Sequence, residues 1–271
     1  MEFEIKPQGR IGLGLKELWQ YRELFFIFTL RDIKVKYKQT FFGFAWAVFQ
    51  PLMLMIIFTL FFGGNSEEGL PYTVFSFSGL ILWNIFSTGV TNAGNSMITN
   101  ANIIKKIYFP RLIIPISSVL VSLFDFIMAF AVFVGLLIYH GVHVHLLKFI
   151  IMLIISLGIT SMATFGIGTL LSALNIKYRD FRYVIPFMVQ ALLFATPVIL
   201  PVSQMVKKYH SLEYILALNP MYSAIELFRS GFSDQPLQTN LLGLSFGSAV
   251  LFFIIGLYYF RKTEAYFADV V

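Results

Sequence analysis

The sequence predicts an all-α, polytopic membrane protein with six transmembrane helices, an N-terminal amphipathic interface helix and short re-entrant external helices before the last span. Of its 271 residues, 58% are hydrophobic and 13% are charged, whereas a soluble domain carries about a quarter charged residues. Its apolar residues recur in runs of about 20, the length that crosses the hydrocarbon core of a bilayer. Sixteen of its 20 Lys and Arg residues lie at the two ends of the chain or in alternate connections between the runs, as they do in multi-pass membrane proteins.

Six apolar runs are the expected spans. The first is interrupted by Pro51, the second is unusually polar, and the fifth is short and flanked by prolines. The runs cover residues 42–62, 72–98, 112–139, 147–174, 184–200 and 241–260. They define a transmembrane domain of residues 42–260 between a cytoplasmic N-terminus, residues 1–41, and a cytoplasmic tail, residues 261–271.

The positive residues predict the orientation. Only four of the 20 Lys and Arg residues, namely Lys148, Lys207, Lys208 and Arg229, fall on the opposite side from the two termini when six spans are drawn. Because Lys and Arg accumulate in cytoplasmic loops, we expect a multi-pass protein of the bacterial inner membrane with both termini in the cytoplasm. The net charge of +6 then reflects topology and contact with anionic membrane lipids, and no nucleic-acid partner is expected.

Two segments outside the spans have a helical character of their own. Residues 13–38 mix apolar and charged side chains in a helical rhythm, which predicts an amphipathic helix in the cytoplasmic interface. A solvated helical tail is the alternative, and the Trp and Phe content argues against it. Residues 201–240 are too apolar for a solvated loop and too broken for a span, so two short helices that dip into the outer leaflet fit best.

Several kinds of catalytic site are excluded. The sequence has no Cys, no GxxxxGK[ST] phosphate loop, no HExxH and no GxSxG motif, so we expect no catalytic residue and no ATP hydrolysis by that route. His140, His143 and His145 stand in one short external loop and could hold zinc. Since no carboxylate or Cys completes such a site nearby, a polar hairpin without a metal is the preferred interpretation.

The second span carries polar residues on one helical face. Asn84, Thr88, Thr91 and Asn95 are spaced by four, three and four residues. Polar side chains are unfavourable against lipid, so this face should point at protein or at a hydrated path. Helix packing through small polar residues and a substrate pathway are equally good interpretations.

Asp125 lies near the middle of the third span, where a charged carboxylate costs roughly 2.5–3.5 kcal/mol on insertion scales. One interpretation is a proton relay or the ion site of an ion-coupled transporter. The preferred interpretation is a protonated or hydrogen-bonded structural residue, because no basic residue lies centrally in another span.

Aromatic residues gather at the start of the first span and recur in the second and fifth. An interfacial aromatic belt explains most of them. The sharper interpretation is that aromatic faces stack on sugar rings while Asn, Ser and Thr bond sugar hydroxyls.

Several short stretches together resemble one family. In order along the chain they are RDIKVKYK at 31–38, FGFAW at 42–46, QPL at 50–52, LSALNIKYRDFR at 171–182, TPVI at 196–199 and LNPM at 218–221. In order and spacing they resemble the permeases of polysaccharide and polyol-phosphate ABC exporters, the type-2 ABC exporter permeases. The matches spread over nearly the whole chain.

The resemblance implies two permeases that work with two separate ATPase subunits, on which ATP and Mg²⁺ would bind, and no cofactor on this chain. It implies export of a lipid-linked polysaccharide such as O-antigen, with teichoic acid or capsule polymer as the alternative. The segment 201–232 would cap the exit. The loops expected to dock on the ATPase contain Lys105, Lys106, Arg111, Lys177, Arg179, Asp180 and Arg182.

The resemblance also places a channel between two permease copies, near the first and fifth spans. Four cations of the interface helix are candidates for a lipid phosphate headgroup, although the positive-inside rule and anionic lipid explain them as well and are preferred. These cations are Arg31, Lys34, Lys36 and Lys38. The candidate residues of the substrate path are Phe42, Trp46, Phe49, Trp83, Asn84, Thr88, Thr91 and Phe194.

Two other functions remain as alternatives. An ion-coupled transporter would use Asp125, and inverted repeats, which are not evident, would support it. A membrane enzyme acting on a lipid-linked sugar would need a constellation of carboxylates or His at the bilayer surface. The external set of that kind, which shows no recognisable spacing, is His210, Glu213, Glu226 and Asp234.

Overall fold

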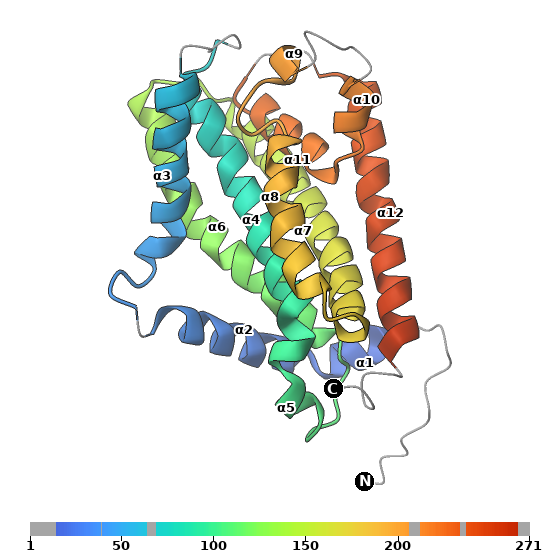
Figure 1. Cartoon of the computed structure of the whole chain (residues 1–271). Coiled ribbons are helices and arrows are strands. Elements are labelled where there is room, and N and C mark those ends of the chain that lie inside the picture. Colours follow the sequence, from blue (N-terminus) through green and yellow to red (C-terminus); the bar gives the residue numbers. More distant parts are fainter. Residues whose placement is uncertain (1–14, 39, 64–68, 206–211, 234–236, 265–271) are drawn as a thin grey trace.

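The computed structural model describes residues 15–38, 40–63, 69–205, 212–233 and 237–264, and within these ranges every regular element is helical. Five helices are long and apolar enough to cross a membrane (Figure 1). They are α3 (Ala45–Phe62), α4 (Tyr72–Thr99), α6 (Ile113–Tyr139), α7 (Leu146–Lys177) and α12 (Thr239–Thr263). The prediction of an all-α membrane protein is confirmed, and these helices coincide with five of the six expected spans. Of the residues discussed above, 1–14, Lys207, Lys208, His210, Asp234 and 265–271 lie outside the described part.

The fifth expected span, residues 184–200, differs from the prediction. Its helix, α8 (Phe181–Phe194), begins earlier and has only 14 residues, which correspond to about 21 Å of helix. The chain then turns, because Pro197 cannot continue a helix and restricts the residue before it. The turn is packed inside the protein: Val198 is fully buried and Thr196 is 1% exposed.

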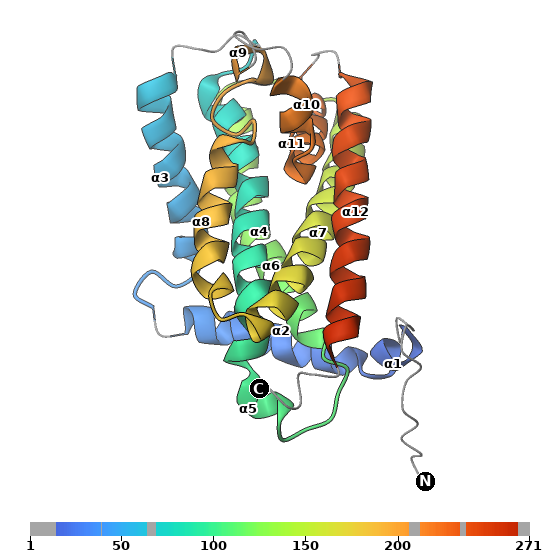
Figure 2. The same cartoon turned by 45° about the vertical axis from the view of Figure 1, so that its right-hand side comes forward.

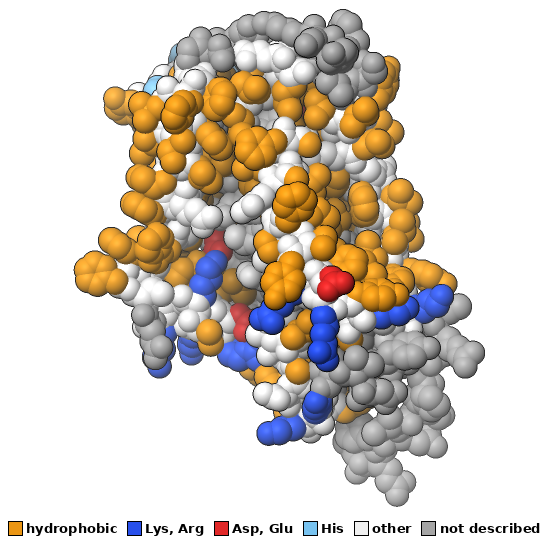
Figure 3. Space-filling view, viewed as in Figure 1, with side chains coloured by type: hydrophobic (Ala, Val, Ile, Leu, Met, Phe, Trp, Pro, Cys, Tyr) orange, Lys and Arg blue, Asp and Glu red, His pale blue; other side chains and the backbone are white. Residues whose placement is uncertain are grey.

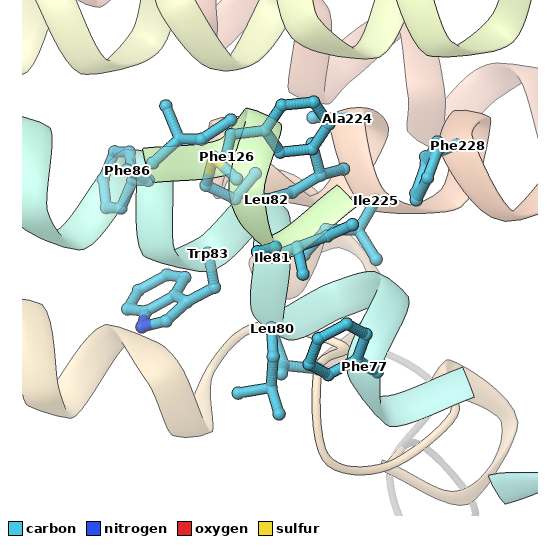
Figure 4. Close-up of a cluster of buried hydrophobic side chains, with 14 of the residues drawn as sticks. Phe77, Leu80, Ile81, Leu82, Trp83, Phe86, Phe126, Ala224, Ile225 and Phe228 are labelled. Carbon is cyan, nitrogen blue, oxygen red and sulfur yellow. The ribbon is translucent and has the colours of Figure 1, made fainter. Parts of the chain in front are cut away.

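Helix α4 is the centre of the bundle. It packs along α6 and α7 and also contacts α3, α8 and α11 (Pro220–Ser230) (Figure 2). Its side chains form a large apolar cluster with neighbours from α6 and α11 (Figure 4). The labelled members are Phe77, Leu80, Ile81, Leu82, Trp83, Phe86, Phe126, Ala224, Ile225 and Phe228. A span that is surrounded by protein tolerates polar residues, which explains why this one is the most polar.

Helices α7 and α12 approach each other very closely. A Cβ atom placed on Gly256 would lie 2.0 Å from the carbonyl oxygen of Gly166. Small residues permit such backbone contact between membrane helices, where van der Waals packing drives association. The two glycines therefore set the distance between these helices.

Two helices, α1 (Leu15–Gln20) and α2 (Arg22–Tyr37), lie across the lower end of the bundle, near the short α5 (Ala101–Ile104) (Figures 1 and 2). Helix α2 packs on α6, and its Phe28 and Tyr37 are buried. On the face displayed in Figure 3, apolar side chains cover the flanks of the bundle and Lys and Arg gather around this lower end. The surface thus has the apolar flank and charged rim of a membrane protein.

The segment before the last span forms α9 (Val202–Met205), α10 (Leu212–Ala217) and α11. Helix α11 begins at a good N-terminal signal: the Asn219 side chain accepts a hydrogen bond from the Met221 amide, and Pro220 occupies the first turn. We expected short helices dipping into the outer leaflet, and their depth in a membrane stays a prediction. Most residues of α11 are buried, and the helix packs against α7, α12 and α4.

Candidate functional site

A groove of about 550 Å³ runs between α3, α4 and α8. One wall is the polar face of α4, with Asn84, Ser87, Thr88, Thr91 and Asn92. The rest of the lining, from α4 and the other two helices, consists of two glutamines and apolar side chains, and one cation reaches the groove from α2. These residues are Lys36, Gln50, Pro51, Leu54, Leu80, Trp83, Pro186, Val189, Gln190 and Leu193.

The hydroxyl groups of the α4 wall are held in a defined orientation by hydrogen bonds to their own helix. Thr88 donates its hydroxyl hydrogen to the carbonyl oxygen of Asn84 at 2.6 Å, and Thr91 donates to that of Ser87 at 2.7 Å. A hydroxyl has one donor and two acceptor lone pairs, so a donor bound to the helix leaves acceptor capacity toward the groove. This wall is therefore suited to a ligand rich in O–H or N–H donors.

The predicted polar face of α4 divides into two parts. Asn84, Thr88 and Thr91 line the groove, as one interpretation of this face required. Asn95 instead turns to α7, where its side-chain oxygen accepts a hydrogen bond of 3.0 Å from Asn175. Asn175 also donates to the carbonyl oxygen of Gly94 at 3.0 Å, so helix packing explains this end of the face.

The predicted aromatic residues do not gather at one place. Trp83 lines the groove and is 5% exposed. Phe42, Trp46 and Phe49 contact one another at the start of α3, with ring centroids 5.4–6.2 Å apart, and all three remain exposed. Phe194 is 70% exposed at the end of α8. These four rings lie on the outer surface of the single chain.

Asp125 has partners that sequence reasoning missed. Its carboxylate accepts hydrogen bonds from the Lys36 ammonium on one oxygen and from the Tyr37 hydroxyl on the other. The Asp125 side chain is 1% exposed and that of Lys36 is 36% exposed. Burial, and next the hydrogen bond to Asp125, raise the pKa of Tyr37 well above its usual range, so Tyr37 stays a donor. The counter-charge, Lys36, comes from the interface helix and not from another span.

The four interface cations have two environments. Lys36 reaches the groove. Arg31, Lys34 and Lys38 line a separate open hollow along α2. Arg31 also donates to Asn100 at 2.7 Å and to Asp32 at 2.8 Å, and its guanidinium lies 4.6 Å from the centre of the Phe28 ring.

The predicted docking residues lie at the lower end of the bundle in two loops. Lys105, Lys106 and Arg111 line a hollow of about 200 Å³ that follows α5. Arg111 is already tied to the end of α12, because its guanidinium donates to the carbonyl oxygen of Glu264. The predicted docking residues around the α7–α8 connection are exposed. Lys177 ends α7, Arg179 and Asp180 lie between the helices, and Arg182 lies in the first turn of α8.

His140 bonds within the protein: its Nε2 lies 2.9 Å from the Thr73 hydroxyl oxygen. Within the described ranges, no three potential ligands among His, Cys, Asp and Glu cluster as a metal site.

Arg229 forms a buried cluster that the sequence did not reveal. Its side chain is 4% exposed and forms an ion pair of 3.2 Å with Glu226. The guanidinium stacks 3.5 Å from the Phe75 ring centre and donates to the Phe75 carbonyl oxygen at 3.1 Å. The cluster fixes α11 to α4. Arg229 looked like one of four external cations, and no spacing signal distinguishes it from the others.

Residues 23–233 match the model of the ABC-2 type transporter family, which is more than half of the chain. The chain belongs to the ABC-2 type transporter family. This ABC-2 transporter chain is therefore the membrane component of a transporter and not an enzyme. The resemblance inferred from the short sequence stretches is confirmed.

Curated relatives of this ABC-2 transporter chain extend the comparison. It is 30% identical over 250 residues to an O-antigen export system permease protein, RfbA, of Klebsiella pneumoniae, covering 92% of this chain and 95% of the relative. A protein of the same name from Myxococcus xanthus is 28% identical, with 88% and 91% covered. The polysialic acid transport protein KpsM of Escherichia coli is 24% identical, with 87% and 91% covered.

Proposed function

We propose that this ABC-2 chain is the permease of an ATP-driven exporter that moves a lipid-linked, O-antigen-type polysaccharide from the cytoplasm across the inner membrane. The observation that carries the proposal is the groove, whose wall combines hydroxyl and amide side chains with Trp83. Sugars have hydroxyl edges and apolar faces, so hydrogen-bonding groups beside an aromatic ring suit them. The relatives with 28–30% identity are named for O-antigen export, whereas the polysialic acid relative is more distant.

The topology in this proposal has six spans, with α8 and the turn after it as the fifth. Non-helical backbone is tolerated at membrane depth where it is buried in protein, as Thr196 and Val198 are. Residues 1–41 and 261–271 lie in the cytoplasm, α1 and α2 lie in the interface, and residues 201–240 form the outer cap. The distribution of Lys and Arg supports this orientation.

The proposed assembly contains two copies of this chain and two ATPase subunits, on which ATP and Mg²⁺ bind. Exposed Phe42, Trp46, Phe49 and Phe194 are suited to meet the second copy beside the groove, which would bring them to the substrate path. The loops that contain Lys105, Lys106, Lys177, Arg179, Asp180 and Arg182 dock on the ATPase, and Arg111 links one of them to α12. Movement of the loops by ATP would shift the population between closed and open states.

Two alternative functions, an ion-coupled transporter and a membrane enzyme, lose their support. Asp125, the candidate ion site, is paired with Lys36 and Tyr37. Glu226, a candidate for a membrane enzyme, is paired with Arg229.

Deletion of the gene in its native strain tests the proposal. We expect the surface polysaccharide to disappear, the lipid-linked glycan to accumulate on the cytoplasmic side, and the wild-type gene to restore export. A pull-down in mild detergent should recover an ATPase with a phosphate-loop motif at about one copy per permease. A deletion strain with normal surface polysaccharide would contradict the proposal.

A further inference from the structure

Lys36 belongs to two environments at once. It lines the groove, and its ammonium group binds the buried carboxylate of Asp125. Its side chain is 36% exposed while that of Asp125 is 1% exposed, so Asp125 reaches Lys36 from the protein side and the groove reaches it from the other.

Lys36 is also the one charged side chain among the described residues that line the groove. The neighbouring cations are directed elsewhere: Arg31, Lys34 and Lys38 line the separate hollow, and Arg31 also binds Asn100 and Asp32. An anionic group in the groove therefore meets a single cation.

An ammonium group has three donors, and the contact with Asp125 uses one of them. The remaining donors are available to an oxygen anion. A partly desolvated cation without a counter-charge is unfavourable, and a resident carboxylate removes that cost when no ligand is bound. Tyr37 donates to the second oxygen of Asp125 and keeps that carboxylate hydrogen-bonded if Lys36 turns toward a ligand.

We propose that Lys36 binds a phosphate group of the cargo in the groove and that Asp125 is the resident counter-ion with which this phosphate competes. The inference rests on the proposed function, because the junction between a glycan and its lipid carrier is a phosphate ester. Asp125 acts through Lys36 and is a positioning residue. Because Asp125 competes, the phosphate binds to Lys36 more weakly than it would bind to an unpaired lysine. Weaker binding permits release of the cargo.

The test uses the full chain in phosphatidylcholine nanodiscs. Replacing Trp19 and Trp46 by Phe leaves Trp83, which lines the groove, as the sole tryptophan among the three in the chain. The change in its fluorescence reports binding of farnesyl phosphate, with farnesol as the probe that lacks phosphate. Both signals are corrected for partition into empty discs.

We expect Lys36→Gln to raise the Kd of farnesyl phosphate about tenfold, since a charge-assisted hydrogen bond is lost, and to leave that of farnesol unchanged. Lys34→Gln is the matched control on the same helix and should change neither Kd. Asp125→Asn should lower the Kd of farnesyl phosphate several-fold, because the competitor is gone. A purely structural Asp125 would give unchanged or weaker binding, which would overturn the competition.

A second variant covers the case in which Asp125→Asn does not fold. Tyr37→Phe removes a donor from Asp125, strengthens the hold of the carboxylate on Lys36, and should weaken binding of farnesyl phosphate. Equal binding by Lys36→Gln and wild type would overturn the phosphate site.

The source of the phosphate is tested by repeating the titration in phosphatidylglycerol nanodiscs. If the Kd of farnesyl phosphate still differs between wild type and Lys36→Gln, the site binds the phosphate of the carrier. If the two Kd values become equal, the site binds bilayer headgroups and the cargo assignment is overturned. Wild-type protein that binds no farnesyl phosphate overturns this inference alone, since the deletion strain tests export independently.

Discussion

Arg31 in α2 donates a hydrogen bond of 2.7 Å to the side-chain oxygen of Asn100, the residue that separates α4 from α5. The Asn100 amide in turn donates to the Ser96 carbonyl oxygen of α4 at 2.8 Å. The interface helix is thereby joined to the start of the loop that we propose docks on the ATPase. Phe28 of α2 also packs on Phe109 of that loop, with ring centroids 5.5 Å apart, so a displacement of the loop should reach α2 through both contacts.

Asn100→Ala should break this connection. A hydrogen bond to a charged group contributes about 2 kcal/mol, and we expect the free energy of unfolding to fall by about that amount. In the reconstituted complex, the amount of glycan exported per ATP hydrolysed should also fall. Asn102→Ala, an exposed neighbour in α5, is the matched control. If the two variants export the same amount of glycan per ATP hydrolysed, the role of Asn100 is contradicted.

The contact between α7 and α12 should not tolerate a methyl group. We expect Gly256→Ala to lower the stability in detergent by about 1–3 kcal/mol, the usual range for overpacking, because the added Cβ would collide with the Gly166 carbonyl. Gly247→Ala on the same helix has no atom within 4 Å of its Cβ, and helix propensity favours it by up to about 1 kcal/mol. Thermal unfolding should shift in opposite directions for the two variants. A shift of the same sign and size in both would show that the close approach is absent.

Removal of Arg229, the buried cation on α11, should strongly destabilise the protein. Arg229→Ala leaves Glu226 without its 3.2 Å partner and removes the stacking on Phe75, so we expect destabilisation of about 3 kcal/mol or more. Arg229→Lys keeps the charge and loses the planar stacking, and should lie between alanine and wild type. Arg182→Ala, at an exposed position in the first turn of α8, serves as the control in the same thermal measurement. Wild-type stability of Arg229→Ala would refute the anchoring role.

The hydroxyls of the groove wall should matter for transport more than for folding. Thr88→Val and Thr91→Val have nearly the same shape and remove the oxygen that faces the groove. We expect slower export, with assembly and ATP hydrolysis without cargo unchanged, and the double variant should be slower than either single one. Thr99→Val is the control, since Thr99 makes the same kind of bond to its own helix at an exposed position. Export is measured by the appearance of surface polysaccharide after induction.

The sequence was sufficient to predict features set by local composition. The apolar runs gave five long helices, and the spacing of Asn84, Thr88 and Thr91 gave one polar wall. It could not predict features set by contacts between distant segments. Lys36 and Asp125 are separated by 89 residues, and neither the residue types nor the spacing show that they meet. The anchoring of helix α11 is of the same kind, because nothing in its local composition shows that Arg229 stacks on Phe75 of α4.

The end of the helix in the proline-rich fifth span is a further feature that the sequence could not predict. Its composition predicted a short span but not where the helix would stop. Pro186 lies inside α8 and is tolerated, whereas the helix has ended before Pro197. The two prolines differ in their tertiary surroundings, since the turn at Pro197 brings Thr196 within 2.6 Å of the Asn219 side chain.

The hydroxyl groups of Ser87, Thr88 and Thr91 all point their hydrogens at carbonyl oxygens one turn earlier. Successive hydroxyls therefore present nearly equivalent acceptors. If the groove is the substrate path that we propose, a chain of repeating sugars would find a similar set of bonds after each small advance. Such a passage would lack a single strong binding site at which a long polymer stalls.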